Sequence, residues 1–557
     1  MRDGCVLLAD VYRPDDAERH PVLLVRTPYD RTYAAGVHGT VDALRLAEKG
    51  YAVIVQDVRG RFGSEGHFEA YEAEADDGYD SVEWAAALPF SDGNVGMYGT
   101  SYLAQTQYLA ASRQPPSLRA IMPTESPHST FGGDRYRGGA MALGVLSSWA
   151  MTAIAPAEVI RRAQQDPSLW PEFLGVVDDI DNLDERVERL PLVPWPPIDE
   201  RAGGLSDQFD KTVRYDYHPP RPRFQARDIA VPVFVVAGWN DLFLQPNLDL
   251  FHALKQEAAT EEARRFTRLM VGPWSHGTLS STVGEVDFGF RASPLLLDIR
   301  EDVTKLHRRW FDQRLAGKAG GIDDEAPVRI FVMGRNRWQD EETWPVTRAR
   351  AQAWHLQGGG GLAPAPAPEG EPSTFRLDPD NPVRTWGGAL LMAQKYQKGP
   401  VDQARVEAHP DVLVFTSEAL EEDLEVIGRV TFRAWVAADT PDTDLVARLC
   451  DVHPNGRSYN VVDGILRLRF REGLDREKLL EPGEVHQVEV DLWSTAYVFL
   501  PGHCLRLQVC ASDFPRYDRC PGTGETSATA TRILPQRNRL FHDPAHPSHL
   551  ELPVVEA

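Results

Sequence analysis

Short apolar runs alternate with longer amphipathic stretches in the first part of the chain. The runs contain few polar positions, which is typical of parallel strands buried on both faces. Between them, residues 39–50 and 75–89 place apolar side chains at helical spacing. Alternation of strands and helices predicts a doubly wound α/β sheet. The runs are PVLLVR (21–26), YAVIVQD (51–57), NVGMYG (94–99) and LRAIMP (118–123), and a first strand is expected near Val6–Val11.

This rhythm stops near Pro127 and resumes about a hundred residues later. The intervening residues 128–225 carry helical fragments and a Pro-rich, acidic stretch, whereas VPVFVVAGWND (231–241) and RLMVGPWSHG (268–277) again read as buried strands. We therefore expect a helical cap inserted between two strands of one sheet, where ligand loops also lie.

The last part of the chain has a different pattern. The Gly, Ala and Pro-rich stretch 358–372 reads as a linker, and apolar and polar residues alternate after it. In 465–470, for example, Leu466, Leu468 and Phe470 oppose Arg467 and Arg469. Half-buried antiparallel strands in a β-sandwich account for this pattern. The expected division is 1–127 (α/β domain, first part), 128–225 (cap), 226–345 (α/β domain, second part) and 346–557 (β-sandwich).

Composition narrows the classes of function. The 557 residues include 42% hydrophobic and 25% charged residues, and the formal net charge is −23, so nucleic acid and anionic membranes are not expected as partners. The sequence contains no uninterrupted apolar stretch of about 18 residues, so it predicts no membrane span. The start of the chain lacks the sections of a signal peptide, and the five cysteines form no C-x-x-C pair, which favours a cytoplasmic protein without a disulfide framework. The oligomeric state is left open, with a homodimer as one option.

The stretch GNVGMYGTSYLAQTQYLAAS (93–112) suggests a nucleophile. A strand, a sharp turn at Ser101 and a helix form the arrangement by which α/β-hydrolases display a serine. Such a serine needs a carboxylate and then a histidine base, in that chain order, each after a later strand. Asp241 and His276 meet this requirement. The rival histidines, at positions 67, 128 and 307, close no late strand.

One position speaks against this interpretation. The usual turn has a glycine two residues after the serine, and Leu103 stands there. Gly99 relieves crowding on the other side of the turn. The small Ala104 is the residue that we expect to allow the close approach of the helix.

Several further motifs point to a known family. YGTSYLA, VRTPYD, QDVRGRFGSEG, AGWND and VGPWSHG occur at fitting places along the chain. Together they resemble the cocaine esterase and X-prolyl dipeptidyl peptidase group of serine hydrolases, over almost the whole chain. The resemblance implies an α/β-hydrolase domain, an inserted helical cap and a C-terminal jelly-roll-like domain. In that group, no glycine is kept at the position of Leu103.

The resemblance also implies roles for individual residues. Ser101 would attack the acyl carbonyl, His276 would be the base and Asp241 its partner. The Tyr29 hydroxyl and the Tyr102 backbone N–H would form the oxyanion hole; without the resemblance, Tyr29 reads as a packed aromatic residue. The matching pocket positions are Trp149, Phe243, Leu391 and Met392, and Asp134 stands where the esterase has a tryptophan. That departure speaks against bulky aromatic esters, unless Asp134 is a solvent-exposed cap residue.

The leading hypothesis is a serine carboxylesterase that acts on small acyl esters without metal or cofactor. Its rival is an amide-cleaving acylase or X-prolyl aminopeptidase with the same triad. The apolar residues 242–244 speak against binding of a substrate ammonium group there. A more remote alternative is a non-catalytic carbohydrate-binding protein, for which Trp435 and Trp493 would be the argument. No strand–G-x-G-x-x-G–helix or H-E-x-x-H motif supports a nucleotide or zinc site.

Overall fold

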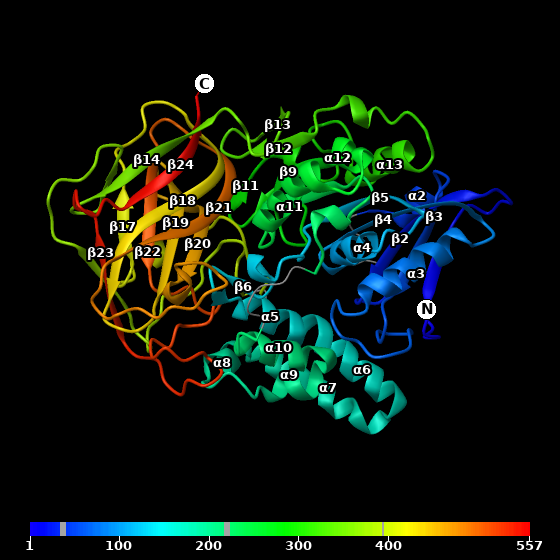
Figure 1. Ribbon diagram of the computed structural model, residues 1–557, viewed down its shortest axis with the longest axis horizontal. Helices are drawn as coiled ribbons and strands as arrows, with labels where there is room; N and C mark the ends of the chain where they lie inside the picture. The colour runs from blue at the N-terminus through cyan, green and yellow to red at the C-terminus, as the bar shows by residue number, and fades with distance from the viewer. Residues whose placement is uncertain (34–40, 217–222, 393–394, 557) are drawn as a thin grey trace.

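A nine-stranded sheet forms the centre of the first part of the chain (Figure 1). The computed structural model describes residues 1–33, 41–216, 223–392 and 395–556. The strand order is β1-β3-β2-β4-β5-β8-β9-β12-β13, and β2, β4, β5, β8, β9 and β12 run parallel to their neighbours in this series. The strands are β1 (Ala9–Tyr12), β2 (His20–Thr27), β3 (Ala52–Asp57), β4 (Ser91–Thr100), β5 (Leu118–Thr124), β8 (Phe234–Asn240), β9 (Arg268–Ser275), β12 (Val328–Val332) and β13 (Arg337–Glu341).

Helices connect these strands, as the alternating pattern predicts. Helix α3 packs against α4, while α2 contacts α13, and α11 lies along β8. The helical prediction for 39–50 begins with two residues outside the described ranges, and the helix itself is shorter than expected. The helices are α2 (Ala43–Ala47), α3 (Glu74–Ala86), α4 (Tyr102–Ser112), α11 (Leu244–Glu257), α12 (Glu261–Phe266) and α13 (Val303–Arg314). The α/β-hydrolase fold class is thus confirmed.

The helical segment lies between β5 and β8, which are neighbours in the sheet. In Figure 1 its helices gather below the sheet and beside the sandwich. Residues 217–222 of the predicted cap lie outside the described residues. The segment contains η1 (Thr130–Asp134), β6 (Tyr136–Arg137), β7 (Ala140–Met141), α5 (Leu143–Trp149), η2 (Ala150–Ile154), α6 (Ala155–Gln165), α7 (Trp170–Asp181), α8 (Leu183–Glu188), α9 (Pro196–Arg201) and α10 (Ser206–Val213).

One helical run in this segment is more apolar than the sequence pattern suggested. By length and composition alone, Leu143–Gln165 could cross a membrane. Small polar residues such as Ser147, Ser148 and Thr152 interrupt it, which is why a search for an uninterrupted apolar stretch misses it. In the structure, 61% of its most apolar window is buried inside the protein, as in the core helix of a globular protein.

The C-terminal part is rich in β strands and has its own hydrophobic core. We expected the Gly-rich stretch 358–372 to be a linker between domains. Instead it contains a turn and a strand of this sheet, β15. Gly359 and Gly360 have φ of +77° and +86°, a conformation that glycine adopts without strain, and they join β14 to β15. The strands are β14 (Ala349–Gln357), β15 (Gly361–Ala363), β16 (Ser373–Leu377), β17 (Leu413–Thr416), β18 (Leu424–Ala438), β19 (Asp444–Val452), β20 (Ser458–Arg467), β21 (His486–Phe499), β22 (Cys504–Cys510), β23 (Gln536–Phe541) and β24 (His549–Val555).

The expected alternation in 465–470 is wrong for its two arginines. Strand β20 ends at Arg467, and Leu468–Phe470 form a 3₁₀ turn. Arg467 and Arg469 are 1% and 4% exposed rather than on a solvated face. Their charges are balanced by carboxylates that are distant in sequence and that the local pattern does not reveal.

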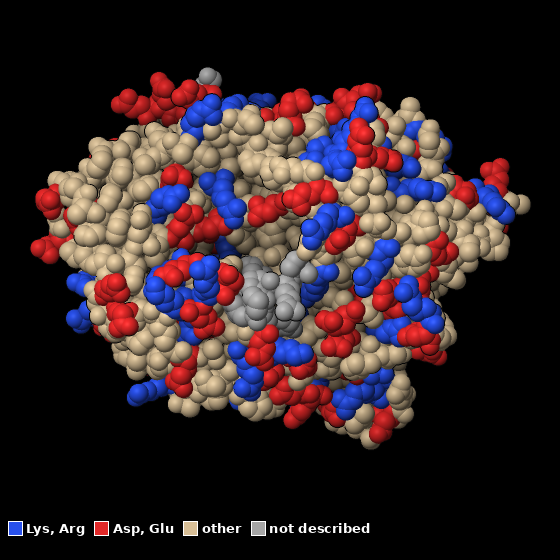
Figure 2. Space-filling model, viewed as in Figure 1, with Lys and Arg blue, Asp and Glu red and all other residues tan. Residues whose placement is uncertain are grey.

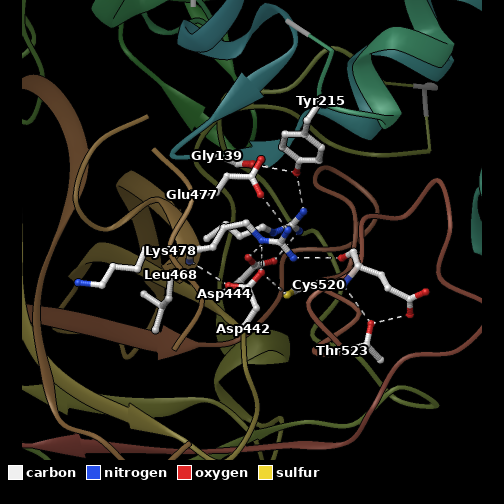
Figure 3. A network of polar contacts seen from close by, with 12 residues as sticks. Gly139, Tyr215, Asp442, Asp444, Leu468, Glu477, Lys478, Cys520 and Thr523 are labelled. Carbon is white, nitrogen blue, oxygen red and sulfur yellow. Dashed lines mark hydrogen bonds and ion pairs between the residues drawn. The ribbon is translucent and has the colours of Figure 1, made fainter. Parts of the chain in front are cut away.

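These carboxylates belong to a buried network between the helical segment and the sandwich (Figure 3). The Arg467 guanidinium donates to Asp444 and to the Tyr215 hydroxyl, at 2.9 and 2.7 Å. The Arg469 Nε donates to Asp442 at 2.7 Å. Tyr215 also donates to the carbonyl oxygen of Gly139, so the network ties this end of the helical segment to the sandwich.

The face seen in Figure 2 carries acidic and basic side chains interspersed, and it is hollowed near the middle. A cleft of this region is lined by residues from the helical segment, α11 and the sandwich, among them Thr130, Gln245 and Trp493. Trp493 is only 7% exposed, and the Arg137 guanidinium lies 3.8 Å from the centroid of its ring. Trp493 is therefore a packed residue and does not support the carbohydrate-binding alternative.

Candidate active site

The three residues predicted to carry the chemistry each follow a parallel strand directly. Ser101 comes after β4, Asp241 after β8 and His276 after β9. These strands lie in the order β4-β5-β8-β9, and their carboxyl ends meet at one edge of the sheet. The fold thus brings together side chains that are up to 175 positions apart in sequence.

The backbone at Ser101 is strained. Its φ of +63° and ψ of −122° lie outside the regions that a residue with a side chain prefers, as is usual for a serine held at a strand-to-helix turn. Gly99 makes this turn feasible, since a Cβ there would lie 2.6 Å from the Cβ of Leu103. Leu103 therefore occupies the space that the side chain of residue 99 would need, and the missing glycine at position 103 is no obstacle.

A continuous chain of hydrogen bonds joins the three side chains. The His276 Nε2 lies 2.9 Å from Ser101 Oγ, and the His276 Nδ1 lies 2.6 Å from Asp241 Oδ2. The second oxygen of Asp241 accepts the backbone N–H of Phe243 at 2.7 Å. Because Asp241 is 1% exposed, its charge fixes the Nδ1–H tautomer of the imidazole and leaves Nε2 free to accept the serine proton.

Phe243 shields the histidine from the side. Its ring is perpendicular to the His276 ring, with the centroids 5.0 Å apart. The neighbouring Leu242 and Leu244 are 6% and 2% exposed. The segment after the aspartate is thus an apolar wall, and it presents no carboxylate to a substrate.

Two hydrogen-bond donors are available near the serine. Tyr102 is the first residue of α4, so its backbone N–H is one of those for which the helix has no acceptor. The Tyr29 hydroxyl accepts a hydrogen bond from the Trp149 indole N–H at 3.0 Å, which leaves its own proton for another acceptor. Burial raises the pKa of Tyr29 to about 12, so the hydroxyl stays protonated at neutral pH.

Aromatic side chains hold these donors in place. The Tyr102 ring stacks on Tyr71 with the centroids 4.4 Å apart, and Tyr71 in turn stacks on Trp149 at 6.3 Å. The Tyr102 hydroxyl donates to Glu74 at 2.8 Å, and Glu74 forms a buried ion pair with Arg26. These contacts anchor the start of α4 under the serine.

The remaining predicted pocket residues lie in two other places. Leu391 and Met392 line a small cavity with Leu242, and the Met392 sulfur occupies the space next to Gly144. Asp134 is 7% exposed, so the prediction of a solvent-exposed cap residue is wrong. Its carboxylate pairs with Arg223 and Arg135, at 3.4 and 3.7 Å, and is therefore not an unpaired charge in the substrate site.

The sequence analysis missed a second carboxylate beside the histidine. Glu125 directly follows β5, as the other three residues follow their strands, and this position was the signal that could have revealed it. It is fully buried, its φ is +52°, and its Oε2 lies 3.8 Å from His276 Nδ1. The same oxygen accepts the Gly277 N–H at 2.7 Å. Burial and the charge of Asp241 raise the pKa of Glu125 well above its usual range.

Glu125 and Lys398 hold the backbone on both sides of the imidazole. The Lys398 Nζ donates to the carbonyl oxygen of His276 at 2.9 Å, and Glu125 accepts the next N–H along the chain. The acids and the imidazole lie close enough together to hold a metal ion, but both ring nitrogens of His276 are engaged, one by Asp241 and the other by Ser101.

The rival histidines lie elsewhere. His67 is exposed in a loop. His128 packs among aromatic rings, 5.9 Å from both Tyr108 and Phe224. His307 is buried in α13, where its Nδ1 lies 2.9 Å from the Val303 carbonyl oxygen.

Comparisons with known proteins agree with the fold. Residues 3–278 match the X-Pro dipeptidyl-peptidase (S15 family) domain, and residues 320–551 match the X-Pro dipeptidyl-peptidase C-terminal non-catalytic domain. The cocaine esterase of Rhodococcus sp. (strain MB1 Bresler) is 34% identical over 572 aligned positions, which cover 100% of this chain and 97% of the esterase.

Solved structures share the whole architecture. An aminopeptidase from a marine sediment archaeon, Thaumarchaeota archaeon, has a TM-score of 0.77 at 22% identity. An α-amino acid ester hydrolase has a TM-score of 0.75 at 24% identity. Each comparison covers 100% of this chain and 95% of the other. At these identities, the likeness establishes the fold.

Proposed function

Because this chain belongs to the X-Pro dipeptidyl-peptidase (S15) family, we propose that it is a serine hydrolase that cleaves small acyl esters through an acyl-enzyme. The observation that carries this proposal is the hydrogen-bonded chain from Ser101 through His276 to Asp241. The resemblance to a cocaine esterase over its full length favours an ester as the substrate.

In the first half of the reaction, Ser101 Oγ attacks the acyl carbonyl carbon while His276 Nε2 takes the hydroxyl proton. The carbonyl oxygen becomes an oxyanion, which receives hydrogen bonds from the Tyr29 hydroxyl and the Tyr102 N–H. Asp241 stabilises the imidazolium that forms. Collapse of the tetrahedral intermediate breaks the ester C–O bond, and the imidazolium gives its proton to the leaving alkoxide.

In the second half, water attacks the acyl-serine. His276 takes a proton from the water, the same two donors stabilise the second oxyanion, and the acid leaves as Ser101 regains its proton. Preorganised donors of this kind are each worth about 10²–10³ in rate. No other group is needed to balance the reaction.

The charges around the site favour a neutral acyl group. Among the described residues that contact His276, the acidic ones are Asp241 and Glu125, and both are engaged in hydrogen bonds. Residues 242–244 are apolar and buried. A substrate with a free α-ammonium group next to its carbonyl would find no unpaired carboxylate among them.

The second candidate is cleavage of an amide bond after an X-Pro dipeptide. The match to the S15 family domain favours it, and the same triad would perform the chemistry. It differs in its demands, since a peptidase of this type must hold the N-terminal ammonium of its substrate.

A comparison of ester and anilide substrates tests the proposal. p-Nitrophenyl acetate and butyrate and glycyl-proline p-nitroanilide would be compared by kcat/KM, on the wild-type protein and on Ser101→Ala. We expect ester turnover that is lost in the variant and little anilide cleavage. Anilide cleavage with the higher kcat/KM would assign the protein to the peptidases, and ester turnover that survives in Ser101→Ala would contradict the mechanism.

A further inference from the structure

Two histidines and an aspartate meet at one end of the sandwich, far in sequence from the residues of the hydrolase site. Asp451 lies on β19, and His453 follows the end of that strand. His503 directly precedes β22, and the two strands pair so that Val452 is opposite Cys504. The antiparallel register thus places His453 and His503 side by side across the ladder.

The polar atoms of these three residues converge. The His503 Nδ1 lies 2.9 and 3.0 Å from the two oxygens of Asp451, and the His453 Nε2 lies 3.4 Å from Asp451 Oδ2. The centroids of the two imidazole rings are 4.4 Å apart. One ligand atom from each residue falls within 4.8 Å of the other two.

The Asp451 carboxylate is held inside the protein, whereas His453 is partly exposed to solvent. Asp451 Oδ2 also accepts the Tyr497 hydroxyl at 2.9 Å, which fixes the carboxylate. The Asp451 side chain is 2% exposed, whereas that of His453 is 33% exposed. The backbone N–H of His453 donates to Arg457, and that of His503 to Leu500, so both turns are held. A solute can therefore reach an arrangement that is already formed.

We propose that Asp451, His453 and His503 bind a divalent transition-metal ion of the Zn²⁺ class, with water as the fourth ligand. Two imidazoles and a carboxylate are a common ligand set for Zn²⁺ that keeps one position open. With bonds of about 2.0–2.1 Å, the ligand atoms of a tetrahedral site lie roughly 3.4 Å apart. The nitrogens of His503 and His453 lie 2.9 and 3.4 Å from the Asp451 carboxylate oxygens, which is close to this separation. Ca²⁺ and Mg²⁺ prefer sites made of oxygen ligands alone.

Tyr497 has the position of an outer-sphere residue in such a site. Carboxylates that bind metals are commonly held by a hydrogen bond from a second residue, which sets their orientation. The Tyr497 hydroxyl supplies this bond, and the ring packs against Phe499 with centroids 4.9 Å apart.

The site also lies where the sandwich joins the central sheet. Met333 follows β12 and exchanges backbone hydrogen bonds with Ala496 and Val498, the two neighbours of Tyr497. An ion held by the three ligands would fix the ends of β19 and β22 to each other and, through Tyr497, to this junction. Metal binding is thus expected to stabilise the folded protein, since it favours the state in which the ligands converge.

The same sandwich offers a matched control. His355 and His549 face each other on β14 and β24, with ring centroids 5.1 Å apart. Within the described part of the chain, neither ring has a carboxylate oxygen within 4.0 Å. A histidine pair alone is therefore present in the protein without the third ligand.

The test is the binding of Co²⁺ and Zn²⁺ to protein first treated with a chelator and desalted. Bound metal would be counted by equilibrium dialysis, and the visible absorption of Co²⁺ would report imidazole ligation. The wild type should bind one equivalent more than His453→Gln and His503→Gln, and Zn²⁺ should raise its Tm by several degrees. His549→Gln should bind as the wild type does.

His453→Gln is the main variant, because a residue one-third exposed is replaced without disturbing the core. Equal binding by the wild type and by His453→Gln would overturn the proposal, as would an equal loss in His453→Gln and His549→Gln. Ester hydrolysis should be the same in all three histidine variants as in the wild type, which separates this site from the hydrolase site.

Discussion

The indole nitrogen of Trp149 lies 3.0 Å from the hydroxyl oxygen of Tyr29, and this contact decides what the tyrosine can do. An indole N–H only donates, so Tyr29 must be the acceptor. Its own proton is therefore left to point toward Ser101 and toward the oxyanion that forms there. A residue of the helical segment thus orients a donor that lies just after strand β2 of the central sheet.

The two residues should differ in how much they contribute to the rate. Tyr29→Phe removes a donor and should lower kcat about 10²–10³-fold. Trp149→Phe keeps an aromatic wall but lets the hydroxyl rotate, so the loss should be smaller, roughly tenfold, and mainly in kcat. Steady-state kinetics with a p-nitrophenyl ester would measure both.

Tyr98→Phe is the control for this pair. Its buried hydroxyl has no hydrogen-bond partner among the described residues, and its removal should leave kcat unchanged. A Tyr29→Phe variant as active as Tyr98→Phe would rule out the tyrosine as an oxyanion donor.

Glu125 should act through its acceptor oxygen rather than through its charge. Glu125→Gln can still accept the Gly277 N–H and should stay within about threefold of the wild-type kcat. Glu125→Ala removes the acceptor of that N–H, so the loop that carries His276 should lose its position. For Glu125→Ala we expect a loss of at least tenfold in kcat at unchanged KM. Both variants would be measured at the same pH.

The pH profile of Glu125→Gln gives the second readout. Because burial and the charge of Asp241 raise the pKa of Glu125 and so favour its neutral form, the neutral amide should leave the rate profile in place. A profile of kcat/KM that moves by a unit or more would mean that Glu125 is ionised and contributes charge to the imidazolium.

His307 should make the protein less stable in mild acid. Burial lowers its pKa in the folded protein from 6.5 to about 4, so between these values the unfolded chain binds the proton and the folded one does not. Stability from this residue is complete above pH 6.5 and falls as the pH is lowered toward 4. The expected loss between pH 7 and pH 5 is about 2 kcal/mol.

Urea unfolding at the two pH values would measure this loss. His307→Gln cannot take up the proton, so its free energy of unfolding should fall by about 2 kcal/mol less than that of the wild type. Equal pH dependence in the two proteins would show that other groups control the acid sensitivity.

Much of the fold follows from local patterns. The six buried runs of the α/β part correspond to β2, β3, β4, β5, β8 and β9, because a parallel strand covered on both faces must be apolar throughout. The same feature located Ser101, Asp241 and His276, each at the end of such a run. Glu125 follows the fourth run and β5, and it was overlooked because the carboxylate was expected only after the later strands.

The errors arise where distant segments compensate for local polarity. Arg467 reads as a solvated strand position until Asp444 and Asp518 are placed on it by the fold. Asp134 reads as exposed until Arg223 is brought to it from 89 positions away. The Gly-rich stretch 358–372 has the composition of a linker, but Gly361 within it pairs with Thr416 of β17, which no local pattern can show.

The most direct test of the account is to trap the acyl-enzyme. Wild-type protein mixed with p-nitrophenyl butyrate would be quenched in acid within milliseconds, digested and analysed by mass spectrometry, with Ser101→Ala treated in parallel. The account predicts a butyryl group on Ser101, in the peptide that also contains Tyr102, and none on the variant. An adduct on another residue, or rapid turnover by Ser101→Ala without an adduct, would contradict it.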